Sequence, residues 1–425
     1  MIRYIIIFIC AFWMFAARAD AENIENPSTA ESGYDRELLK RGEYEKAIEQ
    51  LRRDYSIFPI NQRVKRNLAE TYVAYGILFF DNKQYEQADA NIRKAIELYP
   101  EEATYAMLRG ICNYHLKKYD IARYELERAR SRKPHSVELL YFLGLTLYET
   151  ENRQQAMELW EQALKLSPDR KEILNILAKA RKETGVESGM DTGHSARFDL
   201  SYDPGVDTSF ALSILDVLES AANQVGAELE HFPEAHVPVA IYKRGDFKIV
   251  TDAPDWSAGA YDGKIRIPFG AMKELTPAMR GILFHEYAHV VVFDMTRGNC
   301  PHWLNEGIAE IFGRKQYDRT IPNPGQAVRK ETIVDFRKLE KGFGSLSAAD
   351  AGAAYQQSFS LVNYVVTTYG WHRVHQILSG LGRGMTIDEA ISSAFSDFNL
   401  GYDGIVKEWR DSVDREMAGK KMMGS

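Results

Sequence analysis

Three residues within five positions have the types and spacing of a metal centre: His285, Glu286 and His289, in the order H-E-x-x-H. If this segment is helical, the two histidines stand one turn apart on one face, so their imidazoles can reach the same ion. Glu286 then lies about 100° around the helix from His285. A carboxylate there can take a proton from a water molecule and return it to a leaving group. The alternative interpretation is an ordinary helix with two partly exposed histidines.

Two glutamates follow shortly afterwards, Glu306 and Glu310, within HWLNEGIAE at residues 302–310. Two imidazoles and one carboxylate suit zinc and leave a fourth position for water and substrate. One of the two carboxylates can complete such a ligand set. The other can accept a hydrogen bond from a liganding histidine and fix its tautomer. The rival third ligands are His302, Asp294 and Glu310.

The segments HEYAH (285–289) and WLNEGIAE (303–310) together resemble the gluzincin pattern of thermolysin-like enzymes and aminopeptidases. The resemblance implies a zinc-dependent peptidase that uses Zn²⁺. It assigns His285, His289 and Glu306 as metal ligands. It also makes Glu286 the general base and Glu310 the residue that orients a histidine, with His285 the expected one.

The rest of residues 196–412 resembles the peptidase MA-like family, which often follows tetratricopeptide (TPR) arrays in bacterial envelope proteins. The matching patterns are GAYDGKIRIP at 259–268, YQQSFSLVNYVVTTYG at 355–370 and a late helix around Trp409. Aminopeptidases of this clan carry a glutamate in a G-x-M-E-N motif. Residues 259–262 read GAYD and have no such glutamate, which favours an endopeptidase.

Residues 259–267 are the expected substrate-binding strand. An edge strand beside the zinc helix would offer the backbone groups of Gly259, Ala260 and Tyr261 to an extended peptide. An ordinary core strand is the alternative interpretation.

The reaction also needs a donor to the developing oxyanion. Tyr355 occupies the place of the family's first motif tyrosine and is the expected donor. Its competitors are Tyr364, His372 and His375.

The elements that must position these residues can be read from the surrounding pattern. Thr276 and Pro277 are a helix start, with a capping hydroxyl and a proline at the first helical position, and the helix should end near Gly298. Upstream, the pattern predicts three strands and one helix. The strands are residues 197–202, 237–242 and 264–268, and the helix is residues 210–225. Helices dominate after Thr276, so we expect an α+β domain over residues 196–415, and the resemblance to gluzincins implies that it is a thermolysin-like zincin domain.

Residues 34–183 repeat with a period of 34 residues, as Pro100, Pro134 and Pro168 illustrate. Small residues recur where paired helices must approach closely, for example Gly110 and Gly144. This pattern resembles the tetratricopeptide repeat, which stacks helical hairpins into an all-α solenoid. We count four units, the first irregular. The array offers either a concave surface for a protein or peptide partner or a rigid spacer.

The ends of the domains follow from composition. Residues 1–19 carry one positive charge, an apolar run at 5–15 and a small-x-small site, Ala17-Arg18-Ala19, which predicts a cleaved signal peptide. The mature chain is then exported, periplasmic or secreted, with no stable membrane span. Residues 184–195 (TGVESGMDTGHS) read as a linker and residues 416–425 as a flexible tail.

Net charge, pI and cysteine content exclude some classes of function without assigning one. A net charge of −7 and a pI near 5.9 give no electrostatic reason to expect nucleic acid as a partner. Cys112 and Cys300 are too few for a disulfide framework, and we expect buried thiols. Two functions compete with a peptidase acting on peptides or proteins: a catalytically silent envelope scaffold, and a zinc hydrolase of other substrates.

Overall fold

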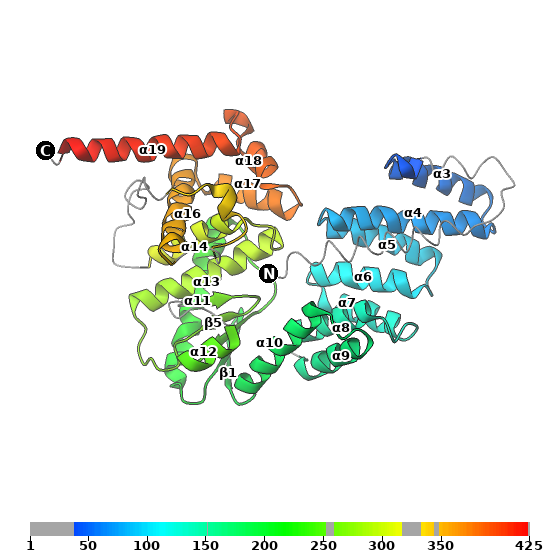
Figure 1. Ribbon diagram of the computed structural model, residues 1–425, viewed down its shortest axis with the longest axis horizontal. Coiled ribbons are helices and arrows are strands. Elements are labelled where there is room, and N and C mark those ends of the chain that lie inside the picture. Colours follow the sequence, from blue (N-terminus) through cyan, green and yellow to red (C-terminus); the bar gives the residue numbers. More distant parts are fainter. Residues whose placement is uncertain (1–37, 151, 252–258, 317–332, 344–347, 424–425) are drawn as a thin grey trace. The chain divides into compact units, whose positions relative to one another are not determined.

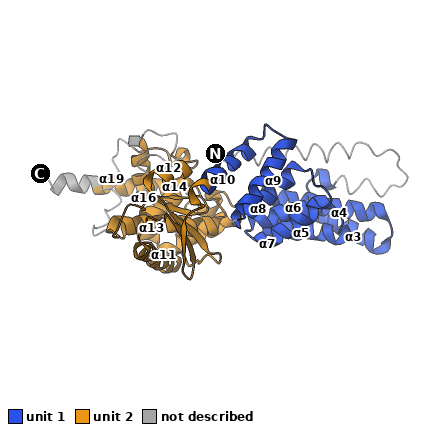
Figure 2. Ribbon diagram, turned by 90° about the horizontal axis from the view of Figure 1, so that it is seen from below, with its two compact units in different colours: residues 1–184 blue, residues 185–425 orange. Residues whose placement is uncertain are grey.

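The computed structural model describes residues 38–150, 152–251, 259–316, 333–343 and 348–423. The chain divides into two compact units, residues 1–184 and residues 185–425, which Figure 2 colours separately. The predicted signal peptide, residues 1–19, lies outside the described residues. Over the part of the chain that is described, every helix is too short or too polar to cross a bilayer.

The first unit is built from antiparallel helices that follow one another along the chain (Figure 1). They are α3 (Tyr44–Ile57), α4 (Gln62–Asp81), α5 (Tyr85–Leu98), α6 (Ala103–His115), α7 (Tyr119–Arg130), α8 (Val137–Glu149), α9 (Arg153–Leu166) and α10 (Lys171–Glu187). Three hairpins, α4/α5, α6/α7 and α8/α9, form the solenoid. Helix α3 stands where the irregular first unit is expected, and α10 follows the last hairpin. The predicted all-α solenoid is confirmed.

Two glycines explain why the hairpins pack so closely. A Cβ atom added at Gly110 would lie 2.6 Å from Leu126 Cγ, and one at Gly144 would lie 2.3 Å from Trp160 Nε1. Both distances are shorter than van der Waals contact, so a side chain at either position would push the two helices of its hairpin apart. The fully buried indole of Trp160 also donates a hydrogen bond to the Tyr141 carbonyl at 3.1 Å.

The second unit contains a five-stranded sheet in the order β1-β2-β3-β5-β4. The strands are β1 (Asp191–His194), β2 (Phe198–Tyr202), β3 (Val237–Ile241), β4 (Ala260–Tyr261) and β5 (Ile265–Ile267). The inner strands β2, β3 and β5 are parallel, while β1 and β4 pair antiparallel at the two edges. All three strands predicted from the sequence are therefore present, and the α+β class is confirmed.

Helices cover both faces of the sheet: the helix at residues 244–251 packs on one face, and the others share a single core with the opposite face. They are α11 (Thr208–Leu229), α12 (Arg244–Thr251), α13 (Pro277–Thr296), α14 (His302–Arg314), α16 (Ala348–Tyr369), α17 (Trp371–Gly382), α18 (Ile387–Ala394) and α19 (Tyr402–Met423), with 3₁₀ turns at Phe336–Leu339 and Ser396–Phe398. Buried side chains of β5, such as Ile265 and Ile267, share one core with Phe284 and Tyr287 of α13. The core thus fixes α13 against the sheet. Cys112 and Cys300 are both buried, in different units.

Two segments that were expected to be a linker and a flexible tail contain regular structure. The expected linker at 184–195 contains the end of α10 and the whole of β1, whose His194 pairs with Asp199 of β2. The sequence DTGH has no apolar alternation, and its strand conformation comes from backbone pairing with β2. The expected tail at 416–425 is helical as far as Met423. Buried residues at helical spacing, including Tyr402, Trp409 and Val413, anchor the start of α19, and the helix continues beyond them.

Candidate metal centre

The first element of the site is α13, whose ends form as the sequence predicts. The Thr276 hydroxyl accepts a hydrogen bond from the Met279 amide at 3.2 Å, and Pro277 occupies the first turn. At the other end Arg297 adopts a left-handed conformation with φ of 52°, followed by Gly298 at φ of 71°. The helix is buried over most of its length, so its polar residues face other protein elements rather than bulk water.

The second element is α14, which packs closely against both α13 and α16 at two glycines. A Cβ atom at Gly307 would lie 2.5 Å from the Ser358 carbonyl oxygen on α16. One at Gly313 would lie 3.0 Å from the Gly281 carbonyl oxygen on α13 and 3.3 Å from His285 Cβ. Because neither glycine has a side chain, α14 can approach both neighbours closely. This approach brings Glu306 to the histidine pair.

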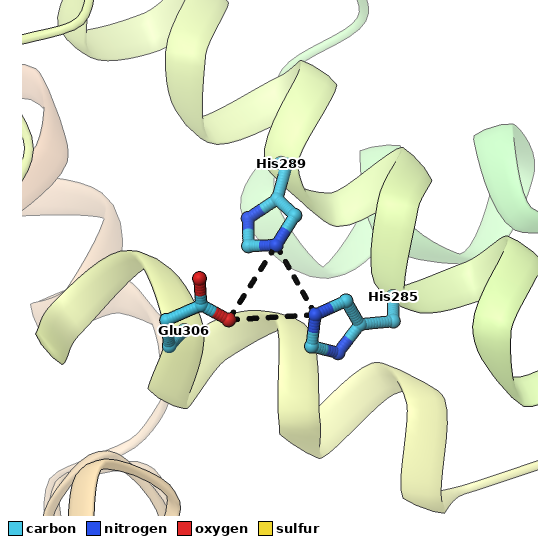
Figure 3. A group of neighbouring side chains, drawn as sticks. All are labelled: His285, His289 and Glu306. Atoms are coloured by element: carbon cyan, nitrogen blue, oxygen red, sulfur yellow. Dashed lines mark hydrogen bonds and ion pairs between the residues drawn. The ribbon is translucent and has the colours of Figure 1, made fainter. Parts of the chain in front are cut away.

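Figure 3 shows His285, His289 and Glu306 pointing toward one another from the two helices. His285 Nε2 and His289 Nε2 lie 3.1 Å apart. Glu306 Oε2 lies 3.4 Å from His285 Nε2 and 3.6 Å from His289 Nε2. Among the described residues this is the group of histidine, cysteine and acidic side chains whose ligand atoms all lie within 4.8 Å.

These distances fit a zinc ion. Ligand atoms held at about 2.0–2.1 Å from a tetrahedral ion lie about 3.3 Å from one another, and the three edges of this triangle are 3.1, 3.4 and 3.6 Å. Glu306 Oε2 is buried and has no well-formed hydrogen bond, since its contact with His285 Nε2 is long at 3.4 Å, although a buried carboxylate oxygen ordinarily needs a good partner. A cation at the centre of the triangle would supply it.

Electrostatics favour charge separation between the ligands when no metal is bound. Burial alone lowers the pKa of His285, but the hydrogen bond and charge of Glu306 outweigh it and raise that pKa to about 9. Burial alone raises the pKa of Glu306, but the charge of His289 and the hydrogen bond from His285 lower it to about 2. A proton on His285 therefore partly neutralises the site in the metal-free protein.

This proton makes metal affinity depend on pH. Below about pH 9 the ion must displace the proton of His285, whereas Glu306 is ionised at every pH well above 2. We therefore expect the apparent zinc affinity to rise about tenfold per pH unit between pH 6.5 and 9 and to level off above pH 9. Competition titrations against a chelating dye, corrected for the dye's own protonation, measure this slope. A flat profile over that range would contradict the assigned His285–Glu306 pair.

The same pair has the opposite effect on the metal-free protein. A histidine whose pKa rises on folding, here from 6.5 to about 9, stabilises the fold fully below pH 6.5. That contribution is lost as the pH rises through 9. Stability and metal affinity of this site therefore change in opposite directions with pH.

A carboxylate and a guanidinium lie behind His285. Glu310 Oε1 lies 3.7 Å from His285 Nδ1, and Arg314 Nε donates a hydrogen bond to Glu310 Oε2 at 2.7 Å. The Arg314 guanidinium also lies 4.1 Å above the centre of the Phe359 ring. Glu310 is thus in the place expected of the residue that orients His285. Sequence reasoning missed Arg314, although its i,i+4 spacing from Glu310 was a visible signal.

The rival third ligands lie outside the triangle. Asp294 Oδ2 contacts His231 Nε2 at 2.8 Å. His302 Nε2 lies 3.5 Å from Glu306 Oε1, the oxygen that does not face the histidine pair. Glu310 faces Nδ1 of His285, the nitrogen that points away from the triangle. The structure thus brings together the set His285, His289 and Glu306.

Glu286 is buried between the metal ligands and the edge of the sheet. Its side chain belongs to the interior, with 6% of the residue exposed. A Cβ atom at Gly259 would lie 2.5 Å from Glu286 Oε1, so the chain entering β4 passes directly over this carboxylate. Residues 259–261 thus lie beside α13. Of the edge strand expected at residues 259–267, only this first part lies at the edge of the sheet. Residues 265–267 form β5, which pairs on both sides and is an inner strand, so that part of the prediction is wrong.

Tyr355 lies on α16, close enough to the same site for its carboxylates to act on the hydroxyl. Burial raises the pKa of the Tyr355 hydroxyl well above its ordinary value, and the charges of Glu306, Glu310 and Glu286 raise it further. Its ring packs edge-on against Phe343 at 5.0 Å. The Tyr364 hydroxyl instead lies 3.3 Å from Glu408 Oε2. The other two competitors, His372 and His375, lie on α17.

Comparison with known families agrees with this division of the chain. Residues 222–415 match the model of the Peptidase MA superfamily. Residues 73–137 and 137–170 match two models of the tetratricopeptide repeat.

Individual proteins share little sequence identity with this chain. The uncharacterized protein ycf37 of Guillardia theta is 25% identical over 134 residues, which cover 29% of this chain and 75% of that protein. Among solved structures, MamA from Desulfovibrio magneticus is 21% identical with a TM-score of 0.31, covering 36% of this chain and 83% of its own. The first TPR domain of human RPAP3 is 20% identical with a TM-score of 0.27, and the match covers 28% of this chain and 92% of that domain's chain.

Proposed function

Because the chain combines tetratricopeptide repeats with a C-terminal domain of the peptidase MA superfamily, we propose that it is a zinc-dependent peptidase of the gluzincin type. His285, His289 and Glu306 would hold the ion. The observation that carries this proposal is the triangle of ligand atoms, with edges of 3.1, 3.4 and 3.6 Å, beside Glu286, a buried glutamate on the helix that carries both histidines. The repeats bind or position a protein partner.

Zinc held by His285, His289 and Glu306 would supply Lewis acidity toward a peptide carbonyl and a water molecule. Glu286 takes the proton of the attacking water and delivers it to the leaving amine. Burial raises the pKa of Glu286, while the charges of His285 and His289 lower it. The net pKa is raised, which suits a carboxylate that must both accept and return a proton.

Tyr355 supports the oxyanion in this proposal. Its raised pKa keeps the hydroxyl protonated at neutral pH, so that the phenol remains a hydrogen-bond donor. A neutral donor is what a developing negative charge needs. Three neighbouring carboxylates, Glu286, Glu306 and Glu310, help to hold Tyr355 in that protonated form.

Strand β4 would bind the substrate. It is the last strand in the sheet order, and Gly259 at its start lies against Glu286. An extended peptide that adds to this edge places one of its carbonyl groups near the proposed general base. Residues 259–262 (GAYD) contain no glutamate to bind a substrate's amino terminus, which favours cleavage within peptides.

Replacing Gly259 by alanine tests the contact between strand and base. The new methyl group would lie 2.5 Å from Glu286 Oε1, and the carboxylate must move to relieve the overlap. We expect kcat to fall about 100-fold, since a displacement of about 1 Å has effects of that order, while zinc content stays the same. Gly245→Ala is the matched control, because a Cβ atom there meets nothing within 4 Å. Equal activity of the two variants would rule out this placement of β4.

Two features of the sequence support export, and we propose that the reaction takes place outside the cytoplasm. The apolar run at residues 5–15 and the small-x-small site Ala17-Arg18-Ala19 have the form of a cleaved signal peptide. The mature enzyme would then act in the periplasm or outside the cell.

The proposed function is tested by metal analysis of the purified protein together with cleavage of a broad peptide library. One zinc per chain and zinc-dependent cleavage are the expected results. Zinc without cleavage of any peptide would reject the peptidase and leave a silent scaffold or a hydrolase of other substrates. Absence of stoichiometric zinc after loading would reject the metal centre itself.

A further inference from the structure

Strand β4 and helix α13 stay in contact beyond the metal ligands. At the start of the strand Gly259 lies against Glu286. Two residues later the ring of Tyr261 meets the ring of Phe293, with centroids 6.0 Å apart and planes at 74°. This edge-to-face arrangement is a favoured one for aromatic pairs. The strand thus runs from the proposed general base to an aromatic pair.

Helix geometry gives the direction and length of this path. Glu286 and Phe293 are seven residues apart, so they lie on the same face of α13, about 10 Å apart along its axis. The two residues from Gly259 to Tyr261 advance about 7 Å along the strand. A peptide bound along β4 would therefore reach the aromatic pair within two or three residues of its scissile bond.

The ring of Phe293 is exposed in an otherwise buried stretch. Phe293 is 40% exposed, whereas the three preceding valines of α13 are at most 4% exposed. Contact with the turn at Gly298, whose Cβ position lies 2.9 Å from the ring, occupies part of the side chain. A partly exposed ring thus lies near the end of α13, next to the partly buried Tyr261 of the edge strand.

We propose that Tyr261 and Phe293 form a side-chain subsite for a bulky apolar residue of the substrate, an inference that rests on the proposed peptidase function. Burial of a leucine, methionine or aromatic side chain against the two rings would remove apolar surface from water on both partners. The subsite makes the preferred substrate an extended peptide with such a residue two or three positions from the scissile bond.

Strand direction assigns the subsite to one side of that bond. Antiparallel pairing is slightly more stable per residue than parallel pairing. Because β4 runs from Glu286 toward Phe293, an antiparallel peptide places its N-terminal part at the aromatic pair. The preferred residue therefore lies on the N-terminal side of the cleaved bond.

The test compares wild type, Phe293→Ala and Phe293→Leu by mass-spectrometric mapping of cleavage sites in a proteome-derived peptide library. Leu212→Ala is the matched control, since Leu212 is 45% exposed and lies near β1, at the opposite edge of the sheet. Zinc content and thermal unfolding are measured for each variant, so that loss of metal or fold is recognised. Individual peptides with phenylalanine or alanine at the mapped position then give kcat/KM.

The expected result is enrichment of bulky apolar residues N-terminal to the wild-type cleavage sites. Phe293→Ala should lower kcat/KM for the phenylalanine peptide by about tenfold or more and leave the alanine peptide nearly unchanged, with Phe293→Leu intermediate and Leu212→Ala like wild type. Cleavage without that enrichment, or enrichment that survives Phe293→Ala, overturns the subsite and leaves the peptidase standing. No cleavage by zinc-loaded wild type overturns both.

Discussion

Replacing Glu286 by glutamine should lower kcat by about 10²–10⁴-fold, the range expected for loss of a general base, while the protein keeps its zinc. Glutamine has the same shape as glutamate but cannot accept a proton from water. Glu286 lies outside the group of ligand atoms formed by His285, His289 and Glu306. The variant should therefore lose hydrolysis and keep its metal. A peptidase assay and a metal analysis of the same sample measure the two.

The matched control is Glu274→Gln, which removes an exposed carboxylate just before α13. It should keep both zinc and activity. If Glu286→Gln retained more than about a tenth of kcat, Glu286 could not be the proton acceptor on which the predicted loss rests. If it lost its zinc, the carboxylate would belong to the metal shell and the ligand assignment would need revision.

The part of the site that could be predicted from sequence is the part that local helix geometry determines. His285, Glu286 and His289 lie on one helix, so their relative directions follow from 3.6 residues per turn once the helix is recognised. The cap at Thr276 and the turn at Gly298 marked that helix in the sequence. The same logic places Glu310 one turn beyond Glu306.

The meeting of α13 and α14 could not be derived from spacing within either helix. It depends on Gly307 and Gly313, where an added Cβ atom would meet Ser358 on α16 and Gly281 on α13. In the sequence these are two glycines in a helical pattern, where glycine ordinarily weakens a helix. Only the resemblance to a known pattern assigned Glu306 as a ligand in advance.

The errors occur where tertiary pairing decides the structure. Strand β1 exists because β2 offers it a partner, and its four residues have no apolar alternation. Helix α12 (Arg244–Thr251) was not predicted, and its buried Phe247 and Val250 pack under the sheet beside Tyr242. Arg314 was missed because an exposed i,i+4 ion pair is the ordinary explanation of such a spacing.

Replacing Glu306 by alanine should abolish stoichiometric zinc binding and, with it, hydrolysis. The carboxylate supplies one of the three protein ligands, and its Oε2 makes no other hydrogen bond. Removal of a group that merely orients a ligand costs about 10–100-fold in metal affinity, so loss of the ligand itself should exceed that range. Zinc titration should give three separate affinities. Wild type should bind zinc most tightly, Glu310→Ala more weakly, and Glu306→Ala most weakly.

His302→Ala is the decisive comparison, because His302 lies one turn before Glu306 and contacts its other oxygen at 3.5 Å. If Glu306 is the third ligand, His302→Ala keeps its zinc and loses at most the about 10–100-fold in affinity expected for a group that orients a ligand. If His302 were the ligand instead, the two variants would exchange behaviour, with zinc lost from His302→Ala and kept by Glu306→Ala. Cobalt substitution adds a second measurement, since replacing an oxygen ligand by water or by nitrogen changes the visible absorption of a tetrahedral Co²⁺ site. The ligand set is thereby decided without any assay of turnover.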